Sequence, residues 1–264
     1  MIEERIEFEN RGGKIIGLLE SPEIKTKTND LILLAHGFTG SMDGPSSLYK
    51  RLAGKLVESG FTVYRFNFRF TSNPFEEHHR MTLAGEVDDL KLLIREFSKK
   101  YGKIGVVGES MGGAVSILGY SPKVECLVLY YPAIFLKENI RTMWSSDEKV
   151  RELREKGVLS YVKRSTNQTL YIGKNFVEGV NAIDTLLPEV IRIKCPVLFI
   201  HGNTDRTVSF TESERAFKAA NEPKKIEIID GAEHGFKDEN YQPCAELQDR
   251  AINLTIGWFK KWLV

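Results

Sequence analysis

One short run of the sequence constrains the fold more than any other: residues 108–113 read Gly-Glu-Ser-Met-Gly-Gly. The run lies between a strand-like segment, residues 103–110, and a helical pattern from residue 111 to about residue 120. A serine at such a strand-to-helix turn adopts a strained backbone conformation, so the positions two residues before and after it must be small. Gly108 and Gly112 meet that requirement. The pattern predicts that Ser110 is presented on a tight turn at the positive end of a helix. A glycine-rich turn with an incidental serine is the alternative interpretation.

Short β-rich segments alternate with helical patterns along most of the chain, as is typical of a mainly parallel sheet covered by helices on both faces. After an N-terminal hairpin (5–9 and 14–20), strands are expected at residues 31–37, 61–68, 103–110, 124–131, 195–202 and 225–229. Helices are expected at residues 45–59, 83–97, 111–120, 211–220 and 243–262. In the last helix, the spacing predicts a buried stripe of Leu247, Ala251, Leu254 and Trp258.

The alternation fails between residues 133 and about 190, where charged residues, Trp144 and several tyrosines occur without a clear pairing of strand and helix. Residues 147–156 have a helical pattern within this stretch. We predict that residues 133–190 form an inserted cap, or lid, and that residues 1–132 and 191–264 form the α/β core. A chain of 264 residues suffices for one such domain with an insertion.

Charge, apolar segments and cysteine spacing indicate which partners and which cellular location to expect. The chain has 37 basic and 36 acidic residues, which argues against nucleic acid as its main partner. Its longest apolar stretch, residues 126–136, is shorter than the roughly 18 residues that cross a bilayer, and the first ten residues do not resemble a signal peptide. Cys126, Cys195 and Cys244 are too widely spaced for a zinc or redox motif. We expect a cytoplasmic protein without an integral membrane segment; the sequence leaves open whether it forms a homo-oligomer.

A serine hydroxyl becomes a useful nucleophile when a neighbouring base takes its proton and a carboxylate orients that base. Catalytic groups in such a sheet lie beyond the carboxyl ends of the strands, so the candidates should directly follow strands. His234 follows the predicted strand 225–229, and Asp205 follows the predicted strand 195–202. We therefore predict a catalytic triad of Ser110, Asp205 and His234.

Other carboxylates fit the acid role less well. Asp230 lies only four residues before His234 and is better suited to capping the strand or turn. Glu109 and Glu233 adjoin the candidate serine and histidine in the sequence, and we expect their side chains to project elsewhere.

The remaining histidines have structural interpretations. His36 and His201 each precede a glycine at a strand end, and we expect both to brace loops. His78 and His79 invite a metal-site interpretation, but adjacent side chains on an extended segment point apart and the spacing matches no metal motif. We therefore expect no metal site.

Acyl transfer also requires two hydrogen-bond donors for the oxyanion of the tetrahedral intermediate. The first is the backbone N–H of Met111, the residue after the candidate nucleophile. The second is expected in the loop after an early strand, at the N–H of Phe38 within residues 34–40.

With four motifs in this order, the chain resembles the serine α/β-hydrolase superfamily over nearly its whole length. The segments HGFTGS (36–41), GESMGG (108–113), HGNTDRTV (201–208) and GAEHGF (231–236) are most similar to small carboxylesterases of the feruloyl and cinnamoyl esterase type. Monoacylglycerol lipases share similar motifs. The resemblance implies the α/β-hydrolase fold and cofactor-free hydrolysis of a carboxylic ester through an acyl-serine intermediate. It also implies that the insert forms a lid over an acyl or aryl pocket.

The expected function is that of a serine carboxylesterase acting on small or medium acyl or aryl esters, hydroxycinnamoyl esters among them. Three alternatives stay open at this point. They are a monoacylglycerol or lysophospholipid lipase, an acyltransferase or peptidase using the same triad, and a catalytically silent hydrolase fold that binds a ligand.

Overall fold

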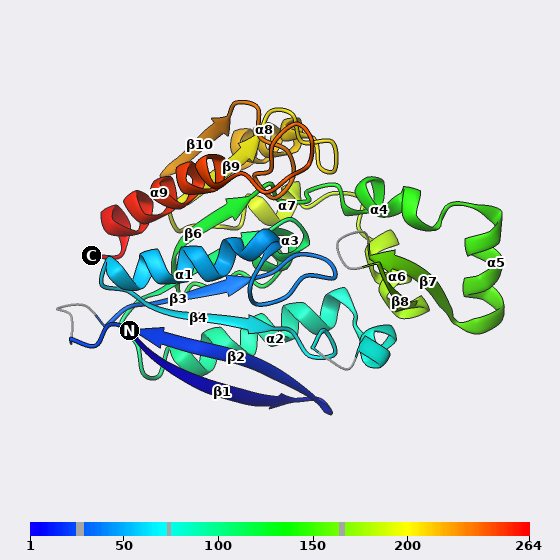
Figure 1. Cartoon of the computed structure of the whole chain (residues 1–264), viewed down its shortest axis with the longest axis horizontal. Coiled ribbons are helices and arrows are strands. Elements are labelled where there is room, and N and C mark those ends of the chain that lie inside the picture. Colours follow the sequence, from blue (N-terminus) through cyan, green and yellow to red (C-terminus); the bar gives the residue numbers. More distant parts are fainter. Residues whose placement is uncertain (25–28, 73–74, 164–166) are drawn as a thin grey trace.

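The computed structural model describes residues 1–24, 29–72, 75–163 and 167–264, with backbone alone at residues 75, 76, 142 and 143. Eight of the described strands form one sheet (Figure 1). Their order across the sheet is β1 (Ile2–Asn10), β2 (Gly13–Ser21), β4 (Thr62–Asn67), β3 (Leu31–Ala35), β5 (Ile104–Glu109), β6 (Val124–Tyr130), β9 (Val197–Gly202) and β10 (Lys224–Ile229). Strand β2 is antiparallel to both β1 and β4, and all neighbours from β4 to β10 run parallel.

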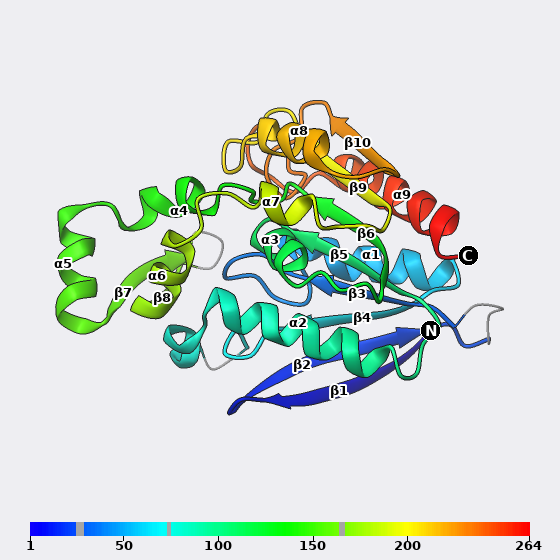
Figure 2. The ribbon, with the colours of Figure 1, turned by 180° about the vertical axis from the view of Figure 1, so that it is seen from behind.

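Helices cover both faces of this sheet, which confirms the predicted fold class. Figure 1 shows α1 (Leu48–Glu58) and α9 (Ala245–Trp262) on one face. Figure 2 shows the opposite face covered by α2 (Leu83–Phe97), α3 (Met111–Leu118), α7 (Leu187–Val190) and α8 (Phe210–Ala219). One apolar core fills each interface. Strands β3, β5 and β9 are buried along their whole length, which explains their nearly continuous apolar runs.

The buried face of α9 includes Ala251 and Trp258, as predicted, but it is wider than the predicted stripe. Leu247 and Leu254 are only partly buried, whereas Gln248 and Thr255, one residue further on, face the interior. The Thr255 hydroxyl is satisfied there, because it bonds the hydroxyl of Tyr130 at 2.6 Å. The Gln248 amide oxygen accepts a hydrogen bond from an arginine of α1.

Within the stretch predicted as a cap, several elements project beyond the carboxyl ends of the parallel strands (Figures 1 and 2). They are α4 (Leu136–Trp144), α5 (Asp147–Lys156), β7 (Val158–Lys163), β8 (Gln168–Gly173) and α6 (Lys174–Asn181). The antiparallel β7–β8 hairpin is absent from the sequence-based expectations. Leu159, Ile172 and Phe176 from these elements join the core on the α2–α3 face. Residues 164–166 of the cap lie outside the described residues, and the boundaries 133–190 stay a prediction.

Two 3₁₀ helices, η1 (Pro45–Ser47) and η2 (Phe75–Arg80), complete the described elements. The expectation that His78 and His79 lie on an extended segment is wrong, because both belong to η2. His78 is buried there and His79 is exposed, so the two side chains still face different surroundings. Across the described ranges, no cluster of three or more histidine, cysteine or acidic residues suits a metal ion. None of the helices in those ranges has both the length and the apolar character needed to cross a membrane.

Candidate active site

The predicted serine turn lies where β5 ends and α3 begins. Ser110 has φ 53° and ψ −118°, a left-handed conformation that costs energy in a non-glycine residue. The turn is held by hydrogen bonds from Ser110 N to Tyr130 O (2.9 Å) and from Ala133 N to Ser110 O (3.1 Å). A Cβ atom at Gly112 would lie 2.2 Å from the carbonyl oxygen of Ala35, so this position requires glycine. The backbone around Ser110 therefore has the strained geometry that the motif predicted.

The loop after β3, residues 36–40, lies directly beside this serine; because it contains Phe38, whose N–H is the predicted oxyanion donor, we call it the oxyanion loop. A Cβ atom added at Gly37 would lie 3.1 Å from the Ser110 Cβ. His36 is fully buried, and its Nδ1 donates to the Gly37 carbonyl oxygen at 2.9 Å, which confirms its bracing role. Burial lowers the pKa of His36 to about 4, so its imidazole is neutral near pH 7. Within the described residues, the N–H groups of Phe38 and Met111 donate to no protein acceptor.

Asp205 and His234 form a direct pair. His234 Nδ1 lies 2.8 Å from Asp205 Oδ2, and the Asp205 side chain is completely buried. Asp205 Oδ1 accepts hydrogen bonds from the backbone N–H groups of Thr207 (2.8 Å) and Val208 (2.9 Å). Burial acts to raise the pKa of Asp205, but the His234 and His201 imidazoles outweigh it and hold this pKa well below its usual range. The carboxylate is therefore ionised, and it directs His234 Nε2 away from itself.

His201 contributes a contact that sequence analysis missed. Its Nδ1 bonds the Ser213 hydroxyl at 2.7 Å and its Nε2 lies 2.9 Å from Val208 O, which confirms the predicted bracing of the loop. The same Nε2 lies 3.4 Å from Asp205 Oδ2. Asp230 accepts instead from the Asn203 amide at 2.7 Å, consistent with a role in the turn.

The expectation that Glu109 projects away from the site is wrong. Its buried carboxylate accepts hydrogen bonds from Gly37 N and from the Tyr131 hydroxyl, each at 2.9 Å. The Tyr131 ring in turn lies 4.4 Å from the His234 ring, measured between centroids. Glu233, by contrast, pairs with the backbone and guanidinium of Arg206. The sequence position of Glu109 beside the candidate nucleophile is the one signal that singles it out.

Residues of the projecting elements pack on the oxyanion loop. The Phe38 ring stacks on Phe176, with centroids 5.1 Å apart and planes 23° apart, and the Tyr161 ring lies 5.8 Å away. At the end of β7, Lys163 Nζ donates to the Thr39 carbonyl oxygen at 2.6 Å. Two aromatic side chains of the projecting elements therefore lie against Phe38 of this loop.

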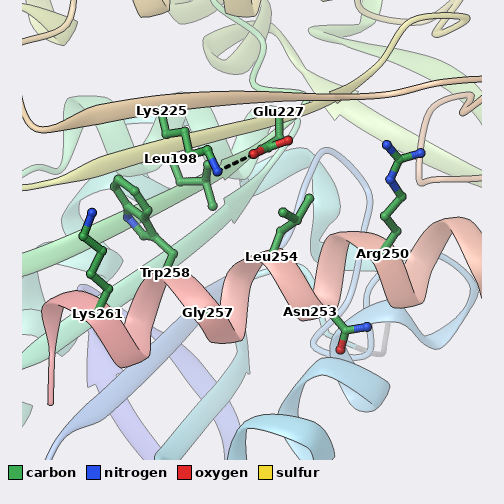
Figure 3. A pocket seen from close by; sticks show the side chains of 9 residues that line it. All are labelled: Leu198, Lys225, Glu227, Arg250, Asn253, Leu254, Gly257, Trp258 and Lys261. Atoms are coloured by element: carbon green, nitrogen blue, oxygen red, sulfur yellow. Dashed lines mark ion pairs between the residues drawn. The ribbon is translucent and has the colours of Figure 1, made fainter.

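A groove elsewhere in the molecule is separate from these residues. It lies between α9 and strands β9 and β10 and has a volume of about 460 Å³ (Figure 3). Leu198 and Lys225 in its lining are each the second residue of their strand, whereas Asp205 and His234 follow the opposite ends of those strands. The groove is therefore at the wrong end of the sheet for the triad candidates.

Residues 26–240 match the model of the family described as serine aminopeptidase, S33. The uncharacterized protein YfhR of Escherichia coli K12 is 24% identical over 217 residues, covering 79% of this chain and 65% of YfhR. The same protein from strain O157:H7 matches equally well. The chain thus spans slightly less than two thirds of the length of the curated relatives it matches.

Solved structures resemble the chain over nearly its whole length. Est1E from Butyrivibrio proteoclasticus with bound ferulic acid has a TM-score of 0.79 at 18% identity, over 98% of this chain and 99% of that chain. A soluble variant of monoglyceride lipase from Saccharomyces cerevisiae, in complex with a substrate analogue, has a TM-score of 0.78 at 16% identity. That match covers 99% of this chain and 95% of the lipase. At these identities the similarity shows a shared fold.

Proposed function

Because the chain belongs to the α/β-hydrolase family described as serine aminopeptidase, S33, we propose that it is a serine carboxylesterase acting on small or medium acyl or aryl esters. The observation that carries the proposal is the pairing of His234 with the buried Asp205 carboxylate, at the same end of the sheet as the strained Ser110 turn. A fixed imidazole near a presented serine is the arrangement that acyl transfer requires.

In the proposed mechanism, Ser110 Oγ attacks the ester carbonyl carbon while His234 Nε2 takes the hydroxyl proton. The N–H groups of Phe38 and Met111 stabilise the oxyanion, and the loss of one such donor typically costs about 100- to 1000-fold in kcat. His234 then gives the proton to the leaving alcohol, which leaves an acyl-serine. A water molecule, deprotonated by His234, hydrolyses the acyl-serine to the carboxylic acid and restores Ser110. Asp205 fixes the imidazole tautomer throughout.

The aromatic residues around Phe38 favour an apolar acyl or aryl group on the substrate. Phe38 and Tyr161 are partly exposed, and the buried Phe176 ring stacks on Phe38. Because Est1E was solved with ferulic acid bound, an aryl ester is one of the substrates to be tested. The similarity to monoglyceride lipase adds a monoacylglycerol to these substrates. The family description, serine aminopeptidase, adds an aminoacyl anilide.

The test compares wild type with Ser110→Ala on p-nitrophenyl esters from acetate to palmitate, methyl ferulate, a monoacylglycerol and leucine p-nitroanilide. Ser98→Ala, at a partly exposed serine directly after α2, is the matched control. We expect ester hydrolysis that disappears in Ser110→Ala and persists in Ser98→Ala. Full activity in Ser110→Ala would refute the serine mechanism. A preference for palmitate and the monoacylglycerol would indicate a lipase, and cleavage of the anilide alone a peptidase.

A further inference from the structure

We propose that Glu109 is a positioning residue whose single buried carboxylate holds both the oxyanion loop and the His234 imidazole in place. The inference deepens the proposed function and rests on it. Glu109 is the last residue of β5 and only 5% exposed, and it comes directly before the candidate nucleophile. Its two carboxylate oxygens have different partners, one on each side of the serine turn.

The first oxygen holds the oxyanion loop. Oε1 accepts from the backbone N–H of Gly37 at 2.9 Å. Gly37 precedes Phe38, so this bond fixes the peptide plane one residue before the proposed oxyanion donor. His36 Nδ1 fixes the carbonyl oxygen of the same glycine at 2.9 Å. Gly37 is therefore held through both its N–H and its C=O, and the N–H of Phe38 is oriented in advance of substrate binding.

The second oxygen supports the imidazole. Oε2 accepts from the Tyr131 hydroxyl at 2.9 Å, and Tyr131 is completely buried with φ 34°, a conformation that favours glycine. A large residue keeps such a conformation when its surroundings impose it. The Tyr131 ring packs against His234 at 4.4 Å and Phe236 at 5.0 Å between centroids. The phenol hydrogen bond therefore fixes the surface on which the His234 ring rests.

The carboxylate also places negative charge near His234 in addition to that of Asp205. The charged and titratable groups that face Glu109 are Tyr49, Tyr131, His234 and Lys237. Burial raises the pKa of Glu109, and the Gly37 N–H, the His234 imidazole and the Tyr131 hydroxyl act to lower it again. In its ionised form, Glu109 favours the imidazolium that arises when Ser110 gives up its proton.

The test uses Glu109→Gln, which keeps the side-chain shape and removes the charge. We expect kcat to fall by up to about 100-fold with little change in KM, because a misplaced catalytic group lowers turnover without weakening binding. The pKa of His234, measured by NMR titration in a Ser110→Ala background and assigned with His234→Asn, should fall by about 0.5 to 1 unit. That titration needs no turnover, so it tests the proposal even if the ester assays refute the proposed function.

Two further variants separate positioning from general stability. Glu212→Gln is the matched control, because Glu212 is also buried and also accepts backbone N–H groups, those of Ile134 and Phe135. It should leave the His234 titration unchanged. Tyr131→Phe removes the hydroxyl but keeps the Glu109 charge, so kcat should fall without a fall in the pKa of His234. Wild-type kcat in folded Glu109→Gln, or in Tyr131→Phe if Glu109→Gln does not fold, would overturn the proposal. So would a Glu212→Gln variant that reproduces the His234 shift.

Discussion

The two oxygens of Asp205 have separate tasks. Oδ1 receives two backbone N–H groups of its own loop, and Oδ2 receives the imidazole of His234. The first task fixes the carboxylate in the loop, and the second selects the tautomer that leaves His234 Nε2 free of its proton. The residue therefore contributes to both the local structure and the proposed chemistry, and a substitution can separate the two.

We predict that Asp205→Asn keeps the fold and lowers kcat by about 10⁴-fold, the loss seen when a triad carboxylate becomes an amide. The amide oxygen can still accept the N–H groups of Thr207 and Val208, but its NH₂ group donates toward His234 and favours the wrong tautomer. Turnover on the best ester and a thermal melt measure the two effects. Asp230→Asn is the control, since Asp230 bonds Asn203. Wild-type turnover in Asp205→Asn would remove this residue from the triad.

The candidate site residues that could be predicted from the sequence are those that lie in short local motifs. The serine turn, and the histidine and aspartate placed directly after strands, depend on short patterns, and the structure brings Asp205 and His234 together as expected. The partners of Glu109 depend on the fold: Gly37 lies 72 positions away in the sequence. A single sequence does not encode such a contact in any local pattern, so the role of Glu109 emerged only from the structure.

Among the secondary-structure elements, the contact between β7 and the oxyanion loop joins the projecting segment to the proposed chemistry. Lys163 and Thr39 are 124 positions apart in the sequence. Burial lowers the pKa of Lys163, and its Nζ reaches a carbonyl oxygen of a loop in which Thr39 has φ 54°. The stacked Phe38 and Phe176 rings add an apolar contact beside this hydrogen bond. Movement of the hairpin would therefore displace the loop that carries Phe38.

We predict that Lys163→Met lowers kcat about 10-fold, because a hydrogen bond from a charged donor contributes roughly 1.5–3 kcal/mol and only part of it acts on the transition state. Methionine keeps the length and the apolar stem of the side chain. Lys156→Met, at an exposed lysine that ends α5, is the matched control and should keep the wild-type kcat. The measurement is the steady-state kcat of wild type and both variants on a short-chain p-nitrophenyl ester. A change of less than about twofold in both variants would show that the contact does not support turnover.

The elements of the core were predictable because burial on two faces imposes a simple pattern on the strands and an apolar stripe on each helix. On α9, Ala251 and Trp258 are buried as predicted, whereas the burial of Gln248 and Thr255 was missed because hydrophobicity does not reveal a polar side chain that is buried with a hydrogen-bond partner. The β7–β8 hairpin was missed for a related reason. Exposed and buried positions mix along both strands, so neither shows the continuous apolar run of a core strand.

At the scale of the whole molecule, most of the buried carboxyl groups described with a shifted pKa have a pKa above the usual value. Burial raises the pKa of Glu20, Glu86, Asp89, Glu109 and Glu212, whereas Asp205 is shifted down. A raised pKa means that the folded state binds a proton more tightly than the unfolded state. Its stabilising contribution is complete below the unfolded pKa and is lost as the pH rises through the folded pKa. For Asp89 that window runs from 3.8 to about 6. Asp205 acts in the opposite sense, losing its contribution as the pH falls.

Glu86 gives the clearest test of how a raised carboxyl pKa makes the stability depend on pH. It is 2% exposed, and among the described residues neither of its oxygens has a hydrogen-bond partner. Burial, and then the nearby Asp89, raise its pKa well above the usual value, and Arg69 opposes them. We predict that Glu86→Gln raises the melting temperature at pH 8 by about 2–4 °C, corresponding to about 1 kcal/mol in a domain of this size, with no gain at pH 4.5.

The measurement is a series of thermal melts from pH 4.5 to pH 8 on wild type, Glu86→Gln and Glu214→Gln, the last at an exposed glutamate of α8. The slopes of melting temperature against pH are compared, because they do not depend on the constant cost of burying the amide. Wild type and Glu214→Gln should lose stability together as the pH rises, and Glu86→Gln should lose less. Parallel curves for all three proteins would mean that Glu86 is ionised in the folded state. In that case the buried carboxylate would be stabilised by Arg69, and the stability of the molecule would not depend on its protonation.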